Sequence, residues 1–276
     1  MENLQSDHLD TQNLYRDMQK RTGGEIYIGV VGPVRTGKST FIKRFMDVAV
    51  LPYMEDAAQK TRAQDELPQS AGGRTITTTE PKFIPQEAVE LKLAGEVTIR
   101  VRLVDCVGFM VEGAAGHLED GAERLVKTPW YDHEIPFTQA AELGTRKVIT
   151  DHSTIGVVVT TDGSFSDLPQ ETYLDAENQA ISELKKLHKP FLVLVNSSHP
   201  SSRTAREAAE RIEKQHSVAA MPVNCAQLSE EDIRQIMEQI LYEFPVSRVE
   251  FYMPKWVEML PFSHPLKTGL IEKIRE

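Results

Sequence analysis

The stretch Gly32-Pro33-Val34-Arg35-Thr36-Gly37-Lys38-Ser39-Thr40 decides the fold of this chain. It fits the pattern G-x-x-x-x-G-K-[ST] of the phosphate-binding P-loop. The apolar run Glu25 to Val31 before it predicts a buried strand, and the apolar spacing from Ser39 to Val50 predicts a helix after it. A strand, a glycine-rich loop and a helix in this order favour a phosphate site over the alternative of a glycine-rich turn that binds nothing.

The residue types of this loop suit a nucleoside triphosphate bound with Mg²⁺. Glycines let successive backbone N–H groups point at phosphate oxygens, and the helix N-terminus adds partial positive charge. We expect Lys38 to reach the β- and γ-phosphates and the Ser39 hydroxyl to bind Mg²⁺. The residues predicted to bind the nucleotide here are Gly32, Pro33, Val34, Arg35, Thr36, Gly37, Lys38, Ser39 and Thr40.

Composition narrows the class of protein. With 276 residues the chain is long enough for one large domain, alone or with appendages. A net charge of -10 at pH 7 argues against non-specific nucleic-acid binding. No apolar run is long enough to span a bilayer, and the polar start from Met1 to Asp10 resembles neither a signal nor a transit peptide. Cys106 and Cys225 lack metal-ligand spacing, which fits a reducing cytosol.

Strands and helices alternate after the P-loop, which predicts an α/β fold with a mostly parallel sheet and helices on both faces. This is a P-loop NTPase fold of GTPase-like (TRAFAC) topology. The polar stretch Glu55 to Thr79 predicts a loop, and Gly108 to Thr150 begins irregularly. Strands are expected at Lys82–Leu93, Val97–Val104, Thr154–Thr161, Phe191–Asn196 and Ala220–Asn224, and helices at Phe137–Ile149, Asp175–Leu187, Ser202–His216 and Ser229–Phe244.

Three segments follow from this pattern. Residues 1–24 are expected to form a helical extension, and residues 25–245 the P-loop domain. Residues 246–276 carry aromatic residues and prolines after the last helix of that domain. They are too few to complete a domain, so we expect them to begin a second, truncated one.

Asp105 ends a predicted buried strand, where open α/β sheets bind ligands. In P-loop proteins an aspartate at this point holds Mg²⁺. Asp105-x-x-Gly108 also matches the switch II pattern, in which the glycine N–H senses the γ-phosphate. The alternative is an aspartate that only caps a turn.

The threonine-rich run Thr75 to Thr79 is the candidate for switch I. A threonine hydroxyl from such a loop closes over Mg²⁺ and the γ-phosphate. Thr78 and Thr79 are the favoured candidates, with Thr79 as a possible Mg²⁺ ligand, because they immediately precede Glu80-Pro81 and the next strand. The run is alternatively the β-prone edge of that strand.

The segment Asn196-Ser197-Ser198-His199 stands where GTPases of the translation-factor-like class carry Asn-Lys-x-Asp. The aspartate of that pattern accepts two hydrogen bonds from guanine, and His199 cannot. Guanine would therefore leave buried donors unpaired, at about 1–3 kcal/mol each. Asn196 is retained as a nucleotide-binding candidate, and ATP is the expected substrate. The alternative is that another residue supplies the acceptor for GTP.

Two further positions depart from the GTPase pattern. Phe109 follows Gly108 where some GTPases have a glutamine that orients water, which an aromatic ring cannot do. Arg35 stands where some cation-dependent relatives carry an asparagine that binds K⁺. It could supply a permanent positive charge to the phosphates, as a built-in arginine finger, or it could point to solvent.

These motifs and several others together resemble the family of stage IV sporulation protein A, the spore coat morphogenetic ATPase of endospore-forming bacteria. The resemblance covers nearly the whole chain after residue 12. The matching stretches are Gly29–Lys43, Ala63–Ser70, Thr78–Phe83, Leu103–Gly108, Thr128–Tyr131, Gly144–Val148, His152–Gly156 and Tyr242–Pro245.

The resemblance implies an ATPase that derives from a GTPase ancestor and uses ATP hydrolysis to drive self-assembly into a static polymer. Such a polymer forms the basement layer of the spore coat at the outer forespore membrane, in the mother-cell cytoplasm. A small amphipathic membrane protein anchors it, and further domains of the family mediate anchoring and contacts with other coat proteins. Carried over by resemblance, Lys38 is the P-loop lysine, Asp105 the switch II metal ligand, and Thr78 and Thr79 the nucleotide-sensing threonines.

Overall fold

The computed structural model describes residue 16 and residues 18–68, 80–93, 97–114, 118–119, 122–165, 168–244 and 254–275. The chain divides into two compact units, Met1–Phe244 and Pro245–Glu276. The second unit contains the short helix α8 (Lys255–Glu258) and the helix α9 (Pro265–Arg275). The sheet and the candidate site belong to the first unit.

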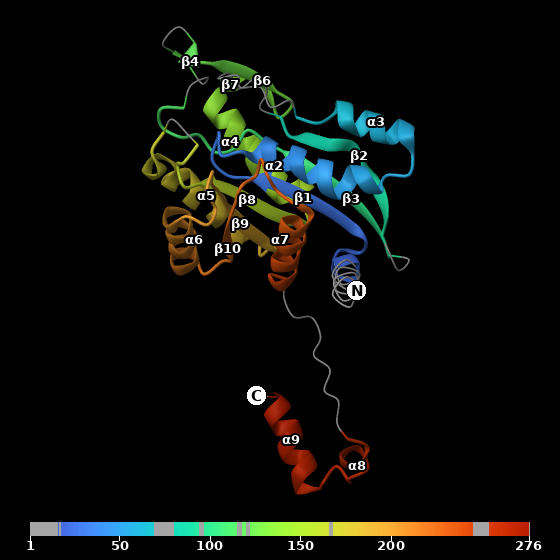
Figure 1. Ribbon diagram of the computed structural model, residues 1–276. Helices are drawn as coiled ribbons and strands as arrows, with labels where there is room; N and C mark the ends of the chain where they lie inside the picture. The colour runs from blue at the N-terminus through green and yellow to red at the C-terminus, as the bar shows by residue number, and fades with distance from the viewer. Residues whose placement is uncertain are drawn as a thin grey trace. The chain divides into compact units, whose positions relative to one another are not determined.

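A six-stranded sheet with the order β10-β9-β8-β1-β3-β2 forms the centre of the first unit (Figure 1). The strand β2 runs antiparallel to β3, and the other neighbours are parallel. The predicted α/β fold with a mostly parallel sheet is therefore confirmed. The strands are β1 (Glu25–Val31), β2 (Lys82–Leu93), β3 (Val97–Asp105), β8 (Ile155–Thr161), β9 (Phe191–Asn196) and β10 (Ala220–Val223).

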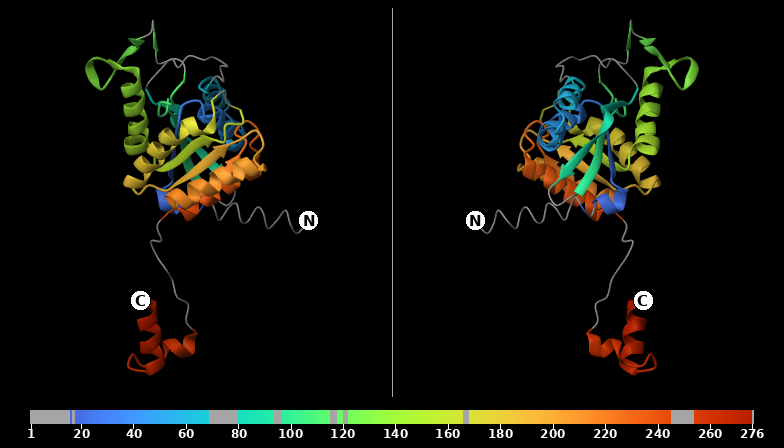
Figure 2. Two further views of the ribbon diagram at one scale, coloured as in Figure 1. Left: turned by 90° about the vertical axis from the view of Figure 1, so that its left-hand side faces the viewer. Right: turned by 90° about the vertical axis from the view of Figure 1, so that its right-hand side faces the viewer.

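Helices cover both faces of this sheet, as predicted (Figures 1 and 2). One face packs against α2 (Lys38–Phe45), α3 (Ala57–Asp65) and α7 (Glu230–Tyr242). The other face packs against η3 (Val148–His152), which continues α4 (Phe137–Lys147), and against α5 (Leu174–Lys186) and α6 (Arg203–His216). Because successive strand residues point to opposite faces, the β1 side chains divide between the two cores. The P-loop directly follows β1 and therefore lies at the carboxyl edge of the sheet.

The helix α3 corrects the prediction of a loop from Glu55 to Thr79. Its first turn is capped by Asp56, whose side chain accepts hydrogen bonds from the backbone N–H groups of Ala58 and Gln59. Ala63 is the buried residue of α3, so the sequence shows no apolar periodicity there. The threonine run Thr75–Thr79 lies outside the described residues.

A β-hairpin occupies part of the stretch that was expected to begin irregularly. The strands β6 (Leu125–Thr128) and β7 (Tyr131–Pro136) pair antiparallel, and α4 begins directly after β7. The hairpin projects beyond the start of α4 (Figure 2). A shorter pair, β4 (Leu118–Glu119) and β5 (Ala122–Glu123), precedes it.

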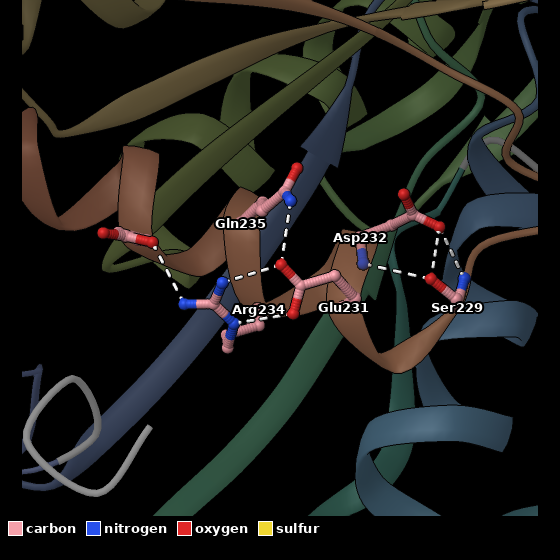
Figure 3. A network of polar contacts seen from close by, with 6 residues as sticks. Ser229, Glu231, Asp232, Arg234 and Gln235 are labelled. Carbon is pink, nitrogen blue, oxygen red and sulfur yellow. Dashed lines mark hydrogen bonds and ion pairs between the residues drawn. The ribbon is translucent and has the colours of Figure 1, made fainter. Parts of the chain in front are cut away.

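The helix α7 begins with a complete capping box (Figure 3). Ser229 Oγ accepts a hydrogen bond from Asp232 N at 3.2 Å, and Asp232 Oδ2 accepts one from Ser229 N at 2.8 Å. In the same first turn, hydrogen bonds from Arg234 and Gln235 lower the pKa of Glu231 to about 2. The capping box satisfies backbone donors that the helix itself leaves unpaired, and it fixes where α7 starts.

We predict that Ser229→Ala lowers the free energy of unfolding by about 1 kcal/mol, because Asp232 N loses its acceptor at the start of α7. In a chain of this size the loss corresponds to a decrease in Tm of roughly 2–4 °C, measurable by differential scanning calorimetry. Ser229→Thr is the matched control and should keep most of the stability. An unchanged Tm for Ser229→Ala would contradict the role of the cap.

Candidate phosphate-binding site

The P-loop connects β1 to α2 with little room for side chains. Gly37 has φ +96° and precedes the first residue of α2. A Cβ atom at Gly37 would lie 2.3 Å from Asn196 Nδ2, and one at Gly32 would lie 2.4 Å from the carbonyl oxygen of Val159. Both glycines are therefore required by close approach as well as by backbone conformation.

Two polar side chains tie the loop to the neighbouring strands. Thr36 Oγ1 donates to the carbonyl oxygen of Val159 in β8 at 2.6 Å. Asn196, at the end of β9, donates from Nδ2 to the carbonyl oxygen of Thr36 at 2.9 Å. The Asn196 Oδ1 atom accepts from the backbone N–H of Cys225 at 3.0 Å. Asn196 thus lies against the P-loop, where it joins three segments that are far apart in sequence.

The predicted Mg²⁺ ligands are in direct contact. Ser39 Oγ donates to Asp105 Oδ2 at 2.7 Å, and the other carboxylate oxygen accepts from Cys106 N at 2.9 Å. A hydroxyl and a carboxylate are hard oxygen donors, which Mg²⁺ prefers along with water and phosphate oxygens. No group of three or more His, Cys, Asp or Glu side chains suited to a metal occurs among the described residues. A two-residue site completed by phosphate and water therefore fits Mg²⁺.

Lys38 and Asp105 are both buried, and burial disfavours the charged form of each. Desolvation lowers the pKa of Lys38, and its Nζ donates to the carbonyl oxygen of Pro33 at 2.6 Å. Desolvation likewise raises the pKa of Asp105, against the opposing effects of the Ser39 hydrogen bond and the Lys38 charge. The site therefore holds one buried positive and one buried negative group. A ligand that brings an opposite charge to each of them stabilises its charged form.

The segment after Asp105 pairs with the P-loop through its backbone. Phe109 N donates to Gly32 O at 3.0 Å, and Val34 N donates to Phe109 O at 2.9 Å. Gly108 has φ +98°, and a Cβ atom there would lie 2.2 Å from Gly32 O and 2.5 Å from Lys38 Nζ. The ring of Phe109 is fully buried. The predicted switch II glycine thus lies against the P-loop lysine, and Phe109 belongs to the core.

Sequence analysis missed the partner of this glycine. Gly108 N donates to Thr145 Oγ1 at 3.2 Å, and Thr145 is a fully buried residue of α4. Threonine inside a helix carries no local signal of such a role. Asp162 and Ser164 at the end of β8 were also missed, although an aspartate that follows a buried strand at the carboxyl edge of the sheet was a usable signal.

Serine hydroxyls organise the segment where GTPases recognise guanine. Ser198 N donates to Ser164 Oγ at 2.8 Å, and His199 N donates to Ser197 Oγ at 3.0 Å. The two hydroxyl oxygens of Ser164 and Ser197 are 3.4 Å apart. His199 itself is exposed. The turn is therefore held by neutral groups, with histidine in place of the usual carboxylate.

The remaining predicted residues are placed as follows. Arg35 is exposed and has φ +63°, a conformation that favours glycine or asparagine. Thr40 is half-buried in the first turn of α2. The structure brings together Lys38, Ser39, Asp105 and Gly108 with the P-loop. Thr78 and Thr79 lie outside the described residues.

We predict that Asp105→Asn raises the Tm of the nucleotide-free protein at neutral pH. The raised pKa of Asp105 means that its carboxylate is less stable in the folded chain than in the unfolded chain, even with the Lys38 charge nearby. This destabilisation is absent below the unfolded pKa of about 3.9, grows between that pH and the higher folded pKa, and is constant above it. The Tm difference between variant and wild type should therefore be small at about pH 4 and larger at neutral pH.

Thermal unfolding across that pH range, without Mg²⁺ or nucleotide, measures the difference. Ser229→Thr, which leaves the site unchanged, is the control for general effects of pH. A lower Tm for Asp105→Asn at every pH would show that the carboxylate stabilises the free site.

Comparison with known proteins identifies the family. The profile described as "Stage IV sporulation protein A, ATPase domain" matches residues 9–245. Stage IV sporulation protein A of Clostridioides difficile (strain 630) is 48% identical over 264 residues, which cover 96% of this chain and 54% of that protein. The protein of the same name from Bacillus subtilis (strain 168) is 44% identical over 268 residues, covering 97% of this chain and 54% of its own length.

The chain thus spans about half the length of these curated relatives. A crystal structure of an SsGBP variant matches with a TM-score of 0.44 and 13% identity over 86% of this chain and 64% of that one, which adds nothing to the assignment. Among the described residues, no helix has the length and apolarity needed to cross a membrane. The chain belongs to the family of the ATPase domain of stage IV sporulation protein A.

Proposed function

We propose that this chain binds ATP with Mg²⁺ and hydrolyses it to drive self-assembly of the basement layer of the spore coat. The observation that carries the ATPase part is the hydrogen bond from Ser39 to Asp105 within a P-loop that has kept Lys38. It joins a hydroxyl and a carboxylate of the kind that hold Mg²⁺ beside the phosphates in P-loop NTPases. Family membership supports the same conclusion.

The proposed mechanism uses groups already at the carboxyl edge of the sheet. Lys38 turns from the Pro33 carbonyl to the β- and γ-phosphates, and the backbone N–H groups of the loop surround the phosphates. Ser39 and Asp105 would hold Mg²⁺, and the bound cation would supply positive charge to the phosphate oxygens. The backbone of Gly108 lies beside Lys38, and its N–H, which donates to Thr145 Oγ1, is the proposed donor to the γ-phosphate. Thr78 and Thr79, outside the described residues, are the proposed switch I threonines, and Thr79 would be a further ligand of the metal.

Selectivity for ATP over GTP follows from the turn at Ser197. Guanine needs an acceptor pair, and His199 cannot provide it. The buried carboxylate of Asp162, two residues before Ser164, is also near this turn. Its Oδ1 atom is already paired, because it accepts a hydrogen bond from Ser164 N at 3.0 Å. Adenine presents no such pair of donors, so the neutral turn does not penalise it.

The proposed biological setting comes from the family. The partners are other copies of the chain, which form the polymer, together with a small amphipathic membrane anchor and other coat proteins. The polymer lies on the outer forespore membrane, on the mother-cell side. The net charge of -10 argues against a nucleic-acid partner.

We predict that phosphate release is faster with ATP than with GTP by at least about tenfold, because guanine leaves one or more donors unpaired. Lys38→Ala and Asp105→Ala should each lower ATP turnover by roughly a hundredfold or more, since each removes charge stabilisation of the transferred phosphoryl group. Phosphate release from the purified chain measures both effects, and Thr160→Val serves as a variant outside the site. Faster GTP turnover would favour the alternative of a regulatory GTPase.

Arg35 is a second proposed source of charge at the phosphates. Its backbone has φ +63°, a conformation that is unfavourable for arginine and that often occurs at functional sites. We expect Arg35→Ala to lower ATP hydrolysis by about a hundredfold, and Arg35→Asn to recover part of that loss in K⁺ but not in Na⁺. Asparagine also tolerates the same backbone conformation, so it controls for strain. A wild-type rate for Arg35→Ala, with or without K⁺, would refute the role.

A further inference from the structure

The Gly108 N–H and the Thr145 hydroxyl form a contact that the proposed chemistry does not use. Gly108 N donates to Thr145 Oγ1 at 3.2 Å, and Thr145 Oγ1 donates in turn to the carbonyl oxygen of Ala141 at 2.8 Å. Gly108 is buried, and Thr145 is 0% exposed. The glycine N–H therefore has a protein acceptor in a place that water does not reach.

The same glycine is next to the phosphate-binding lysine. A Cβ atom on Gly108 would lie 2.5 Å from Lys38 Nζ, so its backbone lies within the shell of groups that surround the terminal phosphate. The next residue, Phe109, is held by backbone hydrogen bonds to Gly32 and Val34. Gly108 is thus fixed on one side by the P-loop and on the other by α4.

Lys38 shows the same kind of pairing. Its Nζ donates to Pro33 O at 2.6 Å. The lysine ammonium and the glycine N–H are the two groups proposed to donate to the phosphates, and each has an acceptor within the protein. A triphosphate must replace these acceptors in order to bind.

We propose that Thr145 is a positioning residue whose hydroxyl competes with the nucleotide γ-phosphate for the Gly108 N–H. The inference rests on the proposed binding of ATP. Without nucleotide, Thr145 holds Gly108 in place. With triphosphate bound, Gly108 turns its N–H to the γ-phosphate and releases Thr145. A diphosphate offers no acceptor there, so it leaves the contact intact.

The helix α4, which contains Thr145, connects the Gly108 contact to the β6–β7 hairpin. Its start is joined to the β6–β7 hairpin, because Phe137 N donates to the carbonyl oxygen of Arg124 at 2.8 Å. In Figure 1 the hairpin and α4 form one continuous projection beside the P-loop end of the sheet. Release of Thr145 therefore removes a tie between the phosphate site and the helix that carries the hairpin.

Thr145→Val tests the competition, because valine has the shape of threonine without its hydroxyl. In the free variant the buried Gly108 N–H loses its hydroxyl acceptor and keeps only the Cys106 sulfur, a weak acceptor, while the triphosphate complex pairs that N–H as before. Affinity for the non-hydrolysable analogue AMP-PNP with Mg²⁺ should rise by about tenfold over wild type. Affinity for ADP should stay unchanged. Isothermal titration calorimetry measures both.

Three further variants make the result specific. Thr145→Ser keeps the hydroxyl and should return AMP-PNP affinity to the wild-type value. Thr160→Val removes a buried hydroxyl that donates to Glu177 Oε2 at 2.7 Å, so it should lower Tm without changing either affinity. If Thr145→Val does not fold, Thr145→Ala replaces it in the same comparison. Hydrogen exchange of the wild-type chain adds an independent measurement, since α4 peptides should exchange faster with AMP-PNP and not with ADP.

The outcomes separate this inference from the proposed function. If neither nucleotide binds the wild-type chain, the ATPase proposal fails at its first step. If AMP-PNP binds wild type and Thr145→Val with equal affinity, or if α4 exchange is the same with AMP-PNP and ADP, the competition is overturned and the ATPase proposal stands. An equal gain for AMP-PNP and ADP would likewise overturn it, because the effect would not depend on the γ-phosphate.

Discussion

The side chain of Asn196 is the contact on which the geometry of the site depends. It donates to the P-loop at Thr36 and accepts from Cys225 after β10, while its own backbone ends β9. The P-loop is also held to β8 by Thr36. A flexible glycine-rich loop thereby acquires a fixed shape from three neighbouring strands. Fixed N–H groups need no reorganisation when charge develops on a phosphate, which is how such a loop contributes to catalysis.

Burial within this geometry destabilises both charges of the site. Burial lowers the pKa of Lys38 and raises that of Asp105, so each charge is less stable there than in water. The protein meets part of this demand with its own groups, through Pro33 O for the lysine and through Ser39 and Cys106 N for the aspartate. A ligand that brings negative phosphate and a divalent cation satisfies both charges at once. The burial of these charges lowers the stability of the free protein, and its relief on binding increases the affinity for the ligand.

Most of the strands and helices could be predicted because their apolar residues repeat with a clear period. The run Phe191 to Asn196 is buried throughout and became β9 as predicted. The helix α3 could not be found this way, since Ala63 is its buried residue and a polar cap at Asp56 starts it. The P-loop, Ser39 and Asp105 were predictable from motif spacing. Thr145 and Ser164 were not, because their roles come from residues distant in sequence.

The sequence by itself determined the kind of fold, the P-loop pattern, the family and the residues that are proposed to hold Mg²⁺. These depend on local patterns and on fixed spacing along the chain, which are visible in one dimension. Only the tertiary structure decided which groups pair when the site is free. Gly108 binds Thr145 and Lys38 binds Pro33 because folding brings α4 and the P-loop to one edge of the sheet. Each of these contacts depends on positions in space that no local pattern encodes.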